Sequence, residues 1–256
     1  MPQKTEAGTF DRLVLPLLIV GGAVVIFAFV FAFTVTPLVV GEAATGGFLE
    51  IDGQYVTNKL LLSQKIFYFH MPVAVVSMAA LVFTALYSVL FLKTRDSAYD
   101  LRARTATEIA LVFVLMTMVT GVAWTRYDWG VWWTWDPRLT TYLILMLMVI
   151  GYFILRTAVS DPERRAVYSS VFGIIVFVNV PLSLMVTRLI PSSIHPVVFR
   201  TDSGLPPLML IPLLLAVMGF CCLGFALYRQ RLQARQMEER VEALKLRLDD
   251  LEALKG

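Results

Sequence analysis

Tryptophan is confined to one short stretch of this 256-residue chain, between positions 124 and 135. The cluster consists of Trp124, Trp129, Trp132, Trp133 and Trp135. Because one indole covers about 150–250 Å², four half-exposed ones present roughly 300–500 Å², the size of patches that mark binding sites. A membrane-interface belt would instead scatter tryptophan over both interfaces and several helices. The clustering therefore favours a binding surface for a flat, apolar ligand.

The two histidines of the chain, His70 and His195, add a second kind of chemistry. A neutral imidazole is a ligand for haem iron, and two imidazoles on opposite faces make the iron six-coordinate. The plainer interpretation is an ordinary hydrogen-bonded histidine beside an apolar segment. Zinc is the weaker metal alternative, because two histidines without nearby cysteines or ordered carboxylates leave its site incomplete.

Charged residues around the tryptophans fit the carboxylates of the same ligand. Arginine binds carboxylates in a bidentate manner, so it suits the two propionates of haem. The candidates are Arg126, Arg138, Arg188 and Arg200. Each is equally well explained as an interfacial residue whose stem lies along apolar surface. Asp136 precedes Pro137, a pair that is typical of a helix start, although Asp136 can also orient an arginine or a histidine.

Composition places these residues in a membrane protein. The chain is 58% hydrophobic and 16% charged, with a mean hydropathy of +0.73, which is too apolar for a soluble domain. Its net charge of +3 comes from dispersed basic residues and indicates no nucleic-acid partner. The adjacent Cys221 and Cys222 point about 100° apart on a helix and rarely bridge. Without a CxxCH motif, we expect no covalent attachment of haem to this chain.

Six apolar runs have the roughly 17–25 residues that a membrane helix needs. They are Leu13–Gly41, Ile66–Leu92, Ile109–Thr125, Leu139–Leu155, Ala166–Thr187 and Ser203–Tyr228. The first run is too long for a cleavable signal peptide. We therefore predict an all-α integral membrane protein with six transmembrane helices, both termini on one side, and the tryptophans in the loop between the third and fourth helices.

The distribution of lysine and arginine predicts which face of the protein is cytoplasmic. They are more numerous in the two terminal segments and in the second and fourth loops than in the other three loops. By the positive-inside rule, both termini are cytoplasmic. The tryptophan loop, His70 and His195 then meet on the external face.

We divide the chain into a membrane domain, residues 1–228, and an amphipathic cytoplasmic helical tail, residues 229–256. In the tail, apolar residues alternate at spacings of four and three over about two heptads. They are Met237, Val241, Leu244, Leu248 and Leu251. Two heptads are too short to hold a coiled coil alone. The tail is thus a solvated continuation of the last span, or it docks a partner helix or lies on the inner leaflet.

Three stretches resemble a known family. Trp129–Thr140, reading WGVWWTWDPRLT, resembles the tryptophan-rich "WWD" signature of the haem-handling superfamily. Lys65–Pro72 and Asn179–Pro181 resemble two shorter motifs of the same proteins. The six spans and the chain length resemble the C-protein (CcmC) family of the system I cytochrome c maturation machinery, rather than its much longer F proteins.

This resemblance implies that His70 and His195 are the axial ligands of a non-covalently bound haem b, cradled by the tryptophan loop. The site would face the periplasm from the bacterial inner membrane. Haem would pass to a chaperone, the E protein, and the partners would include the ABC-type A and B proteins and the small D protein. The chain would be a haem-binding and transfer subunit, without catalysis of its own.

Two other functions remain as alternatives. A b-type cytochrome that carries electrons across the bilayer usually needs haems at two depths and four histidines, and this chain has two. A haem permease subunit usually shows internal repeats and polar groups near the midplane. Asn179 is the most polar residue inside the predicted spans.

Overall fold

The computed structural model describes residues 7–36, 48–51, 54–190 and 206–253. Within these ranges, six helices are long and apolar enough to cross a membrane. They are α1 (Ala7–Thr34), α2 (Asn58–Thr94), α3 (Ser97–Asp128), α4 (Pro137–Ala158), α5 (Pro162–Leu189) and α6 (Pro207–Ala253). The predicted six-span helical membrane fold is confirmed.

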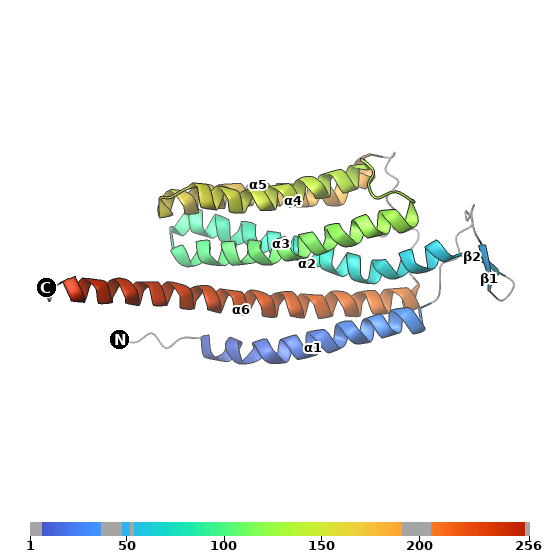
Figure 1. The fold of residues 1–256 in the computed structure, drawn as a ribbon, viewed down its shortest axis with the longest axis horizontal. Helices are drawn as coiled ribbons and strands as arrows, with labels where there is room; N and C mark the ends of the chain where they lie inside the picture. The colour runs from blue at the N-terminus through green and yellow to red at the C-terminus, as the bar shows by residue number, and fades with distance from the viewer. Residues whose placement is uncertain (1–6, 37–47, 52–53, 191–205, 254–256) are drawn as a thin grey trace.

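A small β-hairpin precedes α2, and the sequence analysis did not anticipate it. Its strands are β1 (Phe48–Ile51) and β2 (Gln54–Thr57), paired antiparallel with Phe48 opposite Thr57 and Ile51 opposite Gln54. Such a short two-stranded unit is only marginally stable alone. It leads directly into α2 at Asn58 and lies at the end of the bundle where α6 begins (Figure 1).

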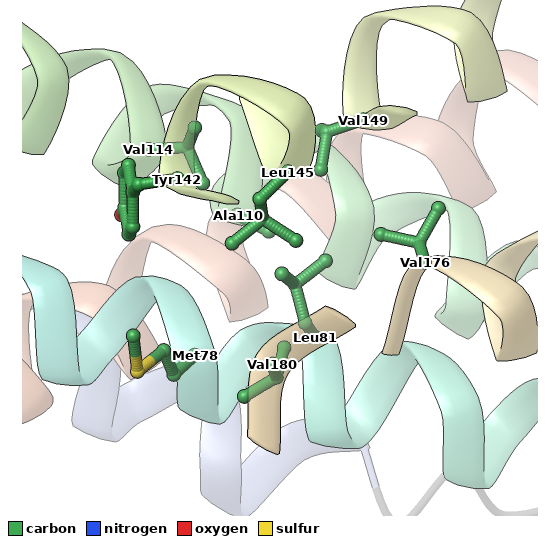
Figure 2. Close-up of a cluster of buried hydrophobic side chains, with 9 residues drawn as sticks. All are labelled: Met78, Leu81, Ala110, Val114, Tyr142, Leu145, Val149, Val176 and Val180. Atoms are coloured by element: carbon green, nitrogen blue, oxygen red, sulfur yellow. The ribbon is translucent and has the colours of Figure 1, made fainter. Parts of the chain in front are cut away.

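The helices form three pairs stacked in layers (Figure 1). The α2–α3 pair is central, between the α4–α5 pair and the α1–α6 pair, and α2 packs against α3, α5 and α6. Figure 2 shows a buried apolar cluster to which α2, α3, α4 and α5 all contribute side chains. Its members are Met78, Leu81, Ala110, Val114, Tyr142, Leu145, Val149, Val176 and Val180. Large apolar side chains also cover the outside, as lipid contact requires.

The helix boundaries have local causes. Asp136 caps α4 by accepting a hydrogen bond from the Arg138 amide (2.9 Å), with Pro137 as the first helical residue, which confirms the expected helix start. Asp161 and Pro162 begin α5 in the same way. Four helices also contain an internal proline, which membrane helices tolerate because neighbours satisfy the freed backbone groups.

Helix α3 begins at Ser97, well before the expected Ile109, because charged residues assigned to a loop are paired within the bundle. The Arg156 guanidinium donates to both oxygens of Asp100, at 2.7 and 2.8 Å. Glu108 accepts from Arg231 at 2.6 Å and from Arg235. Ion pairs with α4 and α6 therefore stabilise the first part of α3, although the composition of this segment is typical of a loop.

Helix α6 is continuous across Tyr228, where the sequence analysis divided the chain. Its C-terminal part projects past the ends of the other five helices (Figure 1). The division at residue 228 therefore remains a prediction about function, and the backbone has no break there. The first turn of α1 and the last turn of α6 lie toward the same end of the bundle (Figure 1).

Candidate functional site

Five of the predicted site residues line a single cavity of about 60 Å³ where α3 ends and α4 begins. Helix α2 supplies His70, α3 supplies Trp124, the loop after α3 supplies Trp129 and Trp133, and α4 supplies Arg138. The fold thus brings an imidazole, three indoles and a guanidinium to one place from three helices and a loop.

A hydrogen bond to Thr120 holds the His70 ring. The His70 Nδ1 atom lies 2.9 Å from the Thr120 hydroxyl oxygen. That hydroxyl also lies 2.8 Å from the carbonyl oxygen of Met116, one helical turn back, where a helical threonine usually donates its only proton. The hydroxyl oxygen then accepts from Nδ1–H. This assignment places the lone pair of the neutral imidazole on Nε2, the form that coordinates a metal.

Neighbouring side chains restrict the same ring sterically. The indole of Trp124 meets it edge to face, with centroids 5.5 Å apart and planes at 84°. A methyl group on Gly121 would lie 3.2 Å from His70 Cε1, so the absence of a side chain there gives the imidazole its room. Phe67 supports Trp124 at 6.3 Å, also edge to face. These contacts therefore restrict the orientation of the imidazole.

The loop between α3 and α4 divides its tryptophans into two groups. Gly130, at φ 76°, reverses the chain after α3, in a backbone conformation that favours glycine. Thr125 donates to the Trp132 carbonyl oxygen at 2.9 Å, which ties the loop back to α3. Trp129 and Trp133 line the cavity, whereas Trp132 and Trp135 are 65% and 75% exposed.

The two exposed tryptophans have different neighbours. Trp135 meets Trp133 edge to face, with centroids 5.9 Å apart. The guanidinium carbon of Arg126 lies 5.7 Å from the Trp132 ring centre, and Arg126 also donates to the Gly130 carbonyl. A cation over an indole face is weakly attractive. Arg126 therefore supports the loop from outside the cavity.

The other predicted charged residues lie in different positions. Arg138 lines the cavity and donates to the Ser183 carbonyl at 3.3 Å, which joins α4 to α5. Asp136 is buried and caps α4. Arg188 lies exposed in the last turn of α5 and does not line the cavity. Of the predicted propionate ligands among the described residues, Arg138 is therefore the one placed at the cavity.

His195 lies outside the described residues, so its role stays a prediction. The helices on either side of it in the sequence end at Leu189 and begin at Pro207. Both ends are at the tryptophan-loop end of the bundle, since Arg138 contacts Ser183 near the end of α5 and Thr36 donates to the Leu208 carbonyl at 3.2 Å.

The sequence analysis missed Thr120, which lies within hydrogen-bond distance of His70, and Gly121, whose missing side chain leaves room for the His70 ring. Thr120 precedes Trp124 by four residues, the spacing that puts two side chains on one helix face. That spacing was a usable signal. No signal in the sequence pointed to Gly121, because its importance depends on how closely α2 approaches α3.

The donor set suits haem in type. An imidazole nitrogen, indole surfaces and a guanidinium match iron, porphyrin and propionate respectively. A volume of about 60 Å³ accommodates only part of such a ring. Among the described residues, no three His, Cys, Asp or Glu side chains group as metal ligands, so the zinc alternative gains no support.

Six apolar helices with an imidazole and indoles gathered around a cavity at one end define a multi-pass membrane protein with a candidate binding site at the bundle end. Residues 9–247 match the family model of heme exporter protein C, CcmC. The chain belongs to this family.

Curated relatives agree with the family match. Heme exporter protein C of Rhodobacter capsulatus is 30% identical over 72% of this chain and 77% of its own length. The protein of the same name from Bradyrhizobium diazoefficiens is 32% identical over 71% and 70%. That of Escherichia coli K12 is 28% identical over 78% and 79%. A Marchantia polymorpha relative, described as a putative cytochrome c biosynthesis ccmC-like mitochondrial protein, is 37% identical over 46% and 49%.

Proposed function

We propose that this protein binds haem b non-covalently at the tryptophan-loop end and presents it to the haem chaperone, the E protein, during c-type cytochrome biogenesis. Its family membership and the names of its relatives support a role in haem handling for cytochrome c maturation. The observation that carries the proposal is His70, held by Thr120 in the cavity that Trp124, Trp129 and Trp133 also line.

Each residue has a distinct task in this proposal. His70 Nε2 binds the iron on one face, and His195 binds it on the other. The cavity tryptophans contact the porphyrin, and Arg138 is the described guanidinium best placed for a propionate. Bound haem supplies the iron and the reactive vinyl edge, while this chain binds and orients the ring.

The site suits a cargo that must leave. A small, open cavity covers only part of a porphyrin, which keeps the affinity below that of a fully enclosed cofactor. Trp132 and Trp135 are exposed and are therefore accessible to an incoming chaperone. The chain then acts as a platform, and ATP hydrolysis belongs to an ABC-type complex of A and B proteins, with the small D protein as a further partner.

The proposed orientation follows from charge. The end of the bundle opposite the tryptophan loop carries the excess of lysine and arginine, so we assign it to the cytoplasm of a bacterial inner membrane. The haem site then faces the periplasm. Single cysteines at positions 127 and 245, introduced after Cys221 and Cys222 are replaced by alanine, are labelled with a membrane-impermeant maleimide to test this. Labelling of intact cells at 245 and not at 127 would overturn the orientation.

The visible absorption spectrum of the purified protein tests the ligands. Wild type, His70→Gly and His195→Gly are compared after reconstitution with haem, in both oxidation states. We expect a low-spin spectrum that becomes high-spin in each variant and returns to low-spin when imidazole is added. Imidazole rescue separates the loss of a ligand from misfolding. A low-spin spectrum retained in either variant would remove that histidine from the site.

A second experiment separates haem binding from haem presentation. The double variant Trp132→Ala with Trp133→Ala is measured for membrane insertion, for haem content and for the yield of haem-loaded chaperone. We expect normal insertion and a reduced yield of loaded chaperone. An unaltered yield would contradict the platform role of the loop.

A further inference from the structure

A second cavity, of about 280 Å³, lies between α2, α3 and α6, away from the candidate haem site. Small residues line its middle: Ala79 and Ala80 of α2, Ala106 of α3 and Gly224 of α6. Phe83 and Phe225 also line it and are 52% and 46% exposed, so the cavity opens to the outside of the bundle, where lipid lies. We call this cavity the α2–α6 groove.

The groove has the length of one lipid chain. Its lining on α2 runs from Val76 to Tyr87, which is about 16 Å at 1.5 Å per residue. One leaflet contributes about 15 Å of the hydrocarbon core. Val76 lies near the middle of the apolar span Lys65–Thr94, and Tyr87 lies nearer its end at the α2–α3 connection. The groove therefore covers the depth of a single leaflet.

The groove is too narrow for a helix. A volume of about 280 Å³ over that length gives a mean cross-section of roughly 17 Å², whereas a helix about 10 Å across needs roughly 80 Å². A helix of another protein, or of a second copy of this chain, could only bridge the opening. A single hydrocarbon chain is narrow enough to lie inside.

One end of the groove is basic. The guanidinium carbon of Arg102 lies 5.4 Å from the centre of the Tyr99 ring, and Tyr99 stacks on Tyr87 with centroids 6.5 Å apart and planes at 24°. Tyr87 and Tyr228 line this end. The guanidiniums of Arg102 and Arg229 both lie within electrostatic reach of the Tyr228 hydroxyl. The groove thus ends beside positive charge at the depth of the lipid head groups.

The carboxylates near this end are engaged elsewhere. Asp100, Glu108 and Glu238 pair with arginines of α4 and α6, and Asp96 caps α3. In the part of the chain that the structure describes, no carboxylate lines the groove and none forms a salt bridge with Arg102. The uncompensated charge therefore favours an anionic ligand.

We propose that the α2–α6 groove binds an anionic phospholipid, with one acyl chain along Ala79, Ala80 and Gly224 and the phosphate on Arg102. A guanidinium binds phosphate in a bidentate manner, and basic pockets between membrane helices take anionic head groups. The lipid belongs to the leaflet at the α2–α3 connection, which is the cytoplasmic leaflet in the proposed orientation. It fills the space where α6 meets α2 and α3.

Native mass spectrometry of the full-length protein, released from nanodiscs of equal phosphatidylglycerol and phosphatidylcholine, tests the head-group site. We expect wild type to retain phosphatidylglycerol with about tenfold preference and Arg102→Gln to lose that preference. Lys93→Gln is the matched control, because Lys93 is exposed at the same end and does not line the groove. Equal retention of the two lipids by wild type, or the same loss in both variants, would overturn the proposal.

Filling the groove tests the acyl-chain site. Added phosphatidylglycerol should raise the unfolding midpoint of wild type in phosphatidylcholine nanodiscs by several degrees, because a ligand of the folded state stabilises it. Ala79→Phe places a ring in the groove and should abolish this rise. Leu86→Phe, at an exposed position outside the groove, should keep it. A midpoint in phosphatidylcholine alone close to that of wild type shows that each variant is folded. An undiminished rise in Ala79→Phe would overturn the proposal.

A photo-crosslinker at position 225 tests the occupant in native membranes. The control is position 227, which is also exposed on α6 but lies outside the groove. We expect lipid adducts at 225 that are enriched in anionic phospholipid relative to those at 227. The same lipid composition at both positions, or a dominant crosslink from 225 to another protein or to a second copy of this chain, would overturn the proposal. None of these outcomes bears on the haem site, which is tested separately by the spectra of the histidine variants.

Discussion

The two ends of the bundle are held together by different forces. At the end with the connection between α2 and α3, charged side chains bind one another across helices, as Arg156 does with Asp100 and as Glu108 does with Arg231 and Arg235. At the tryptophan-loop end, the described contacts include hydrogen bonds to neutral partners, such as those of His70 with Thr120, of Thr125 with the Trp132 carbonyl, and of the buried Lys65 ammonium with the Ala32 and Thr36 carbonyls.

This difference separates a structural end from the proposed binding end. Removing one partner of a buried, bidentate ion pair is strongly destabilising, because it leaves a charge uncompensated. Losing a neutral hydrogen bond typically costs about 1 kcal/mol. We therefore expect the proposed binding end to rearrange around a ligand while the other end keeps the helices in register. Substitutions at the two ends should accordingly affect different measurements.

The largest expected effect comes from the Arg156–Asp100 pair. Asp100→Ala leaves the buried Arg156 guanidinium without its bidentate partner and should lower the free energy of unfolding by about 3–5 kcal/mol. Thermal unfolding in detergent measures this. The double variant Asp100→Leu with Arg156→Met is the control, since it removes both charges and should recover most of the loss. A single variant as stable as wild type would contradict the structural role of this end.

Thr120→Val should weaken haem binding without a large loss of stability. Valine has nearly the shape of threonine but accepts no hydrogen bond from His70 Nδ1–H. Loss of such a partner typically lowers metal affinity by about 10- to 100-fold. Haem titration and the reduction potential of the bound haem measure the effect. Thr120→Ser keeps the hydroxyl and should behave as wild type; equal defects in both variants would point to packing instead.

Gly121→Ala should lower haem affinity without lowering thermal stability. Alanine favours a helix over glycine by about 1 kcal/mol, yet the new methyl group would lie 3.2 Å from His70 Cε1. We expect unchanged or higher thermal stability with haem affinity reduced several-fold. Gly22→Ala, where no atom lies within 4 Å of the added methyl group, is the matched control. Unaltered haem affinity in Gly121→Ala would show that the imidazole has more freedom than its contacts indicate.

The smallest effect should come from Arg126. Arg126→Gln removes the guanidinium over Trp132, a contact worth about 0.5–1 kcal/mol at an exposed position. We expect faster protease cleavage of the loop after α3 and a spectrum of bound haem like that of wild type. A change of spin state in this variant would mean that Arg126 acts on the haem itself.

Much of the fold could be predicted from the sequence, because a bilayer restricts the length and hydropathy of the helices that cross it. Apolar runs long enough to cross a bilayer located all six helices, and the Asp136–Pro137 pair located the start of α4. The early start of α3 escaped prediction for a physical reason. Arg102 and Arg104 look like loop residues until Asp100 and Glu108 are seen to have partners on α4 and α6.

The candidate site was likewise predictable only in part. Residue type alone singled out His70 and the tryptophans, since few other side chains can bind iron or a porphyrin. It did not show that Trp129 and Trp133 line the cavity while Trp132 and Trp135 face outward. That division follows from the turn at Gly130 and the tie between Thr125 and Trp132.

By itself, the sequence determined the membrane class, the number of spans and the candidate residues for a flat, metal-containing ligand, because these depend on hydropathy and chemical type. Only the tertiary structure decided which of those residues share a cavity, and that the His70 ring lies within hydrogen-bond distance of Thr120. Both depend on distances between α2, α3 and α4. Such distances come from packing between helices that are remote in the chain, and no local pattern encodes them.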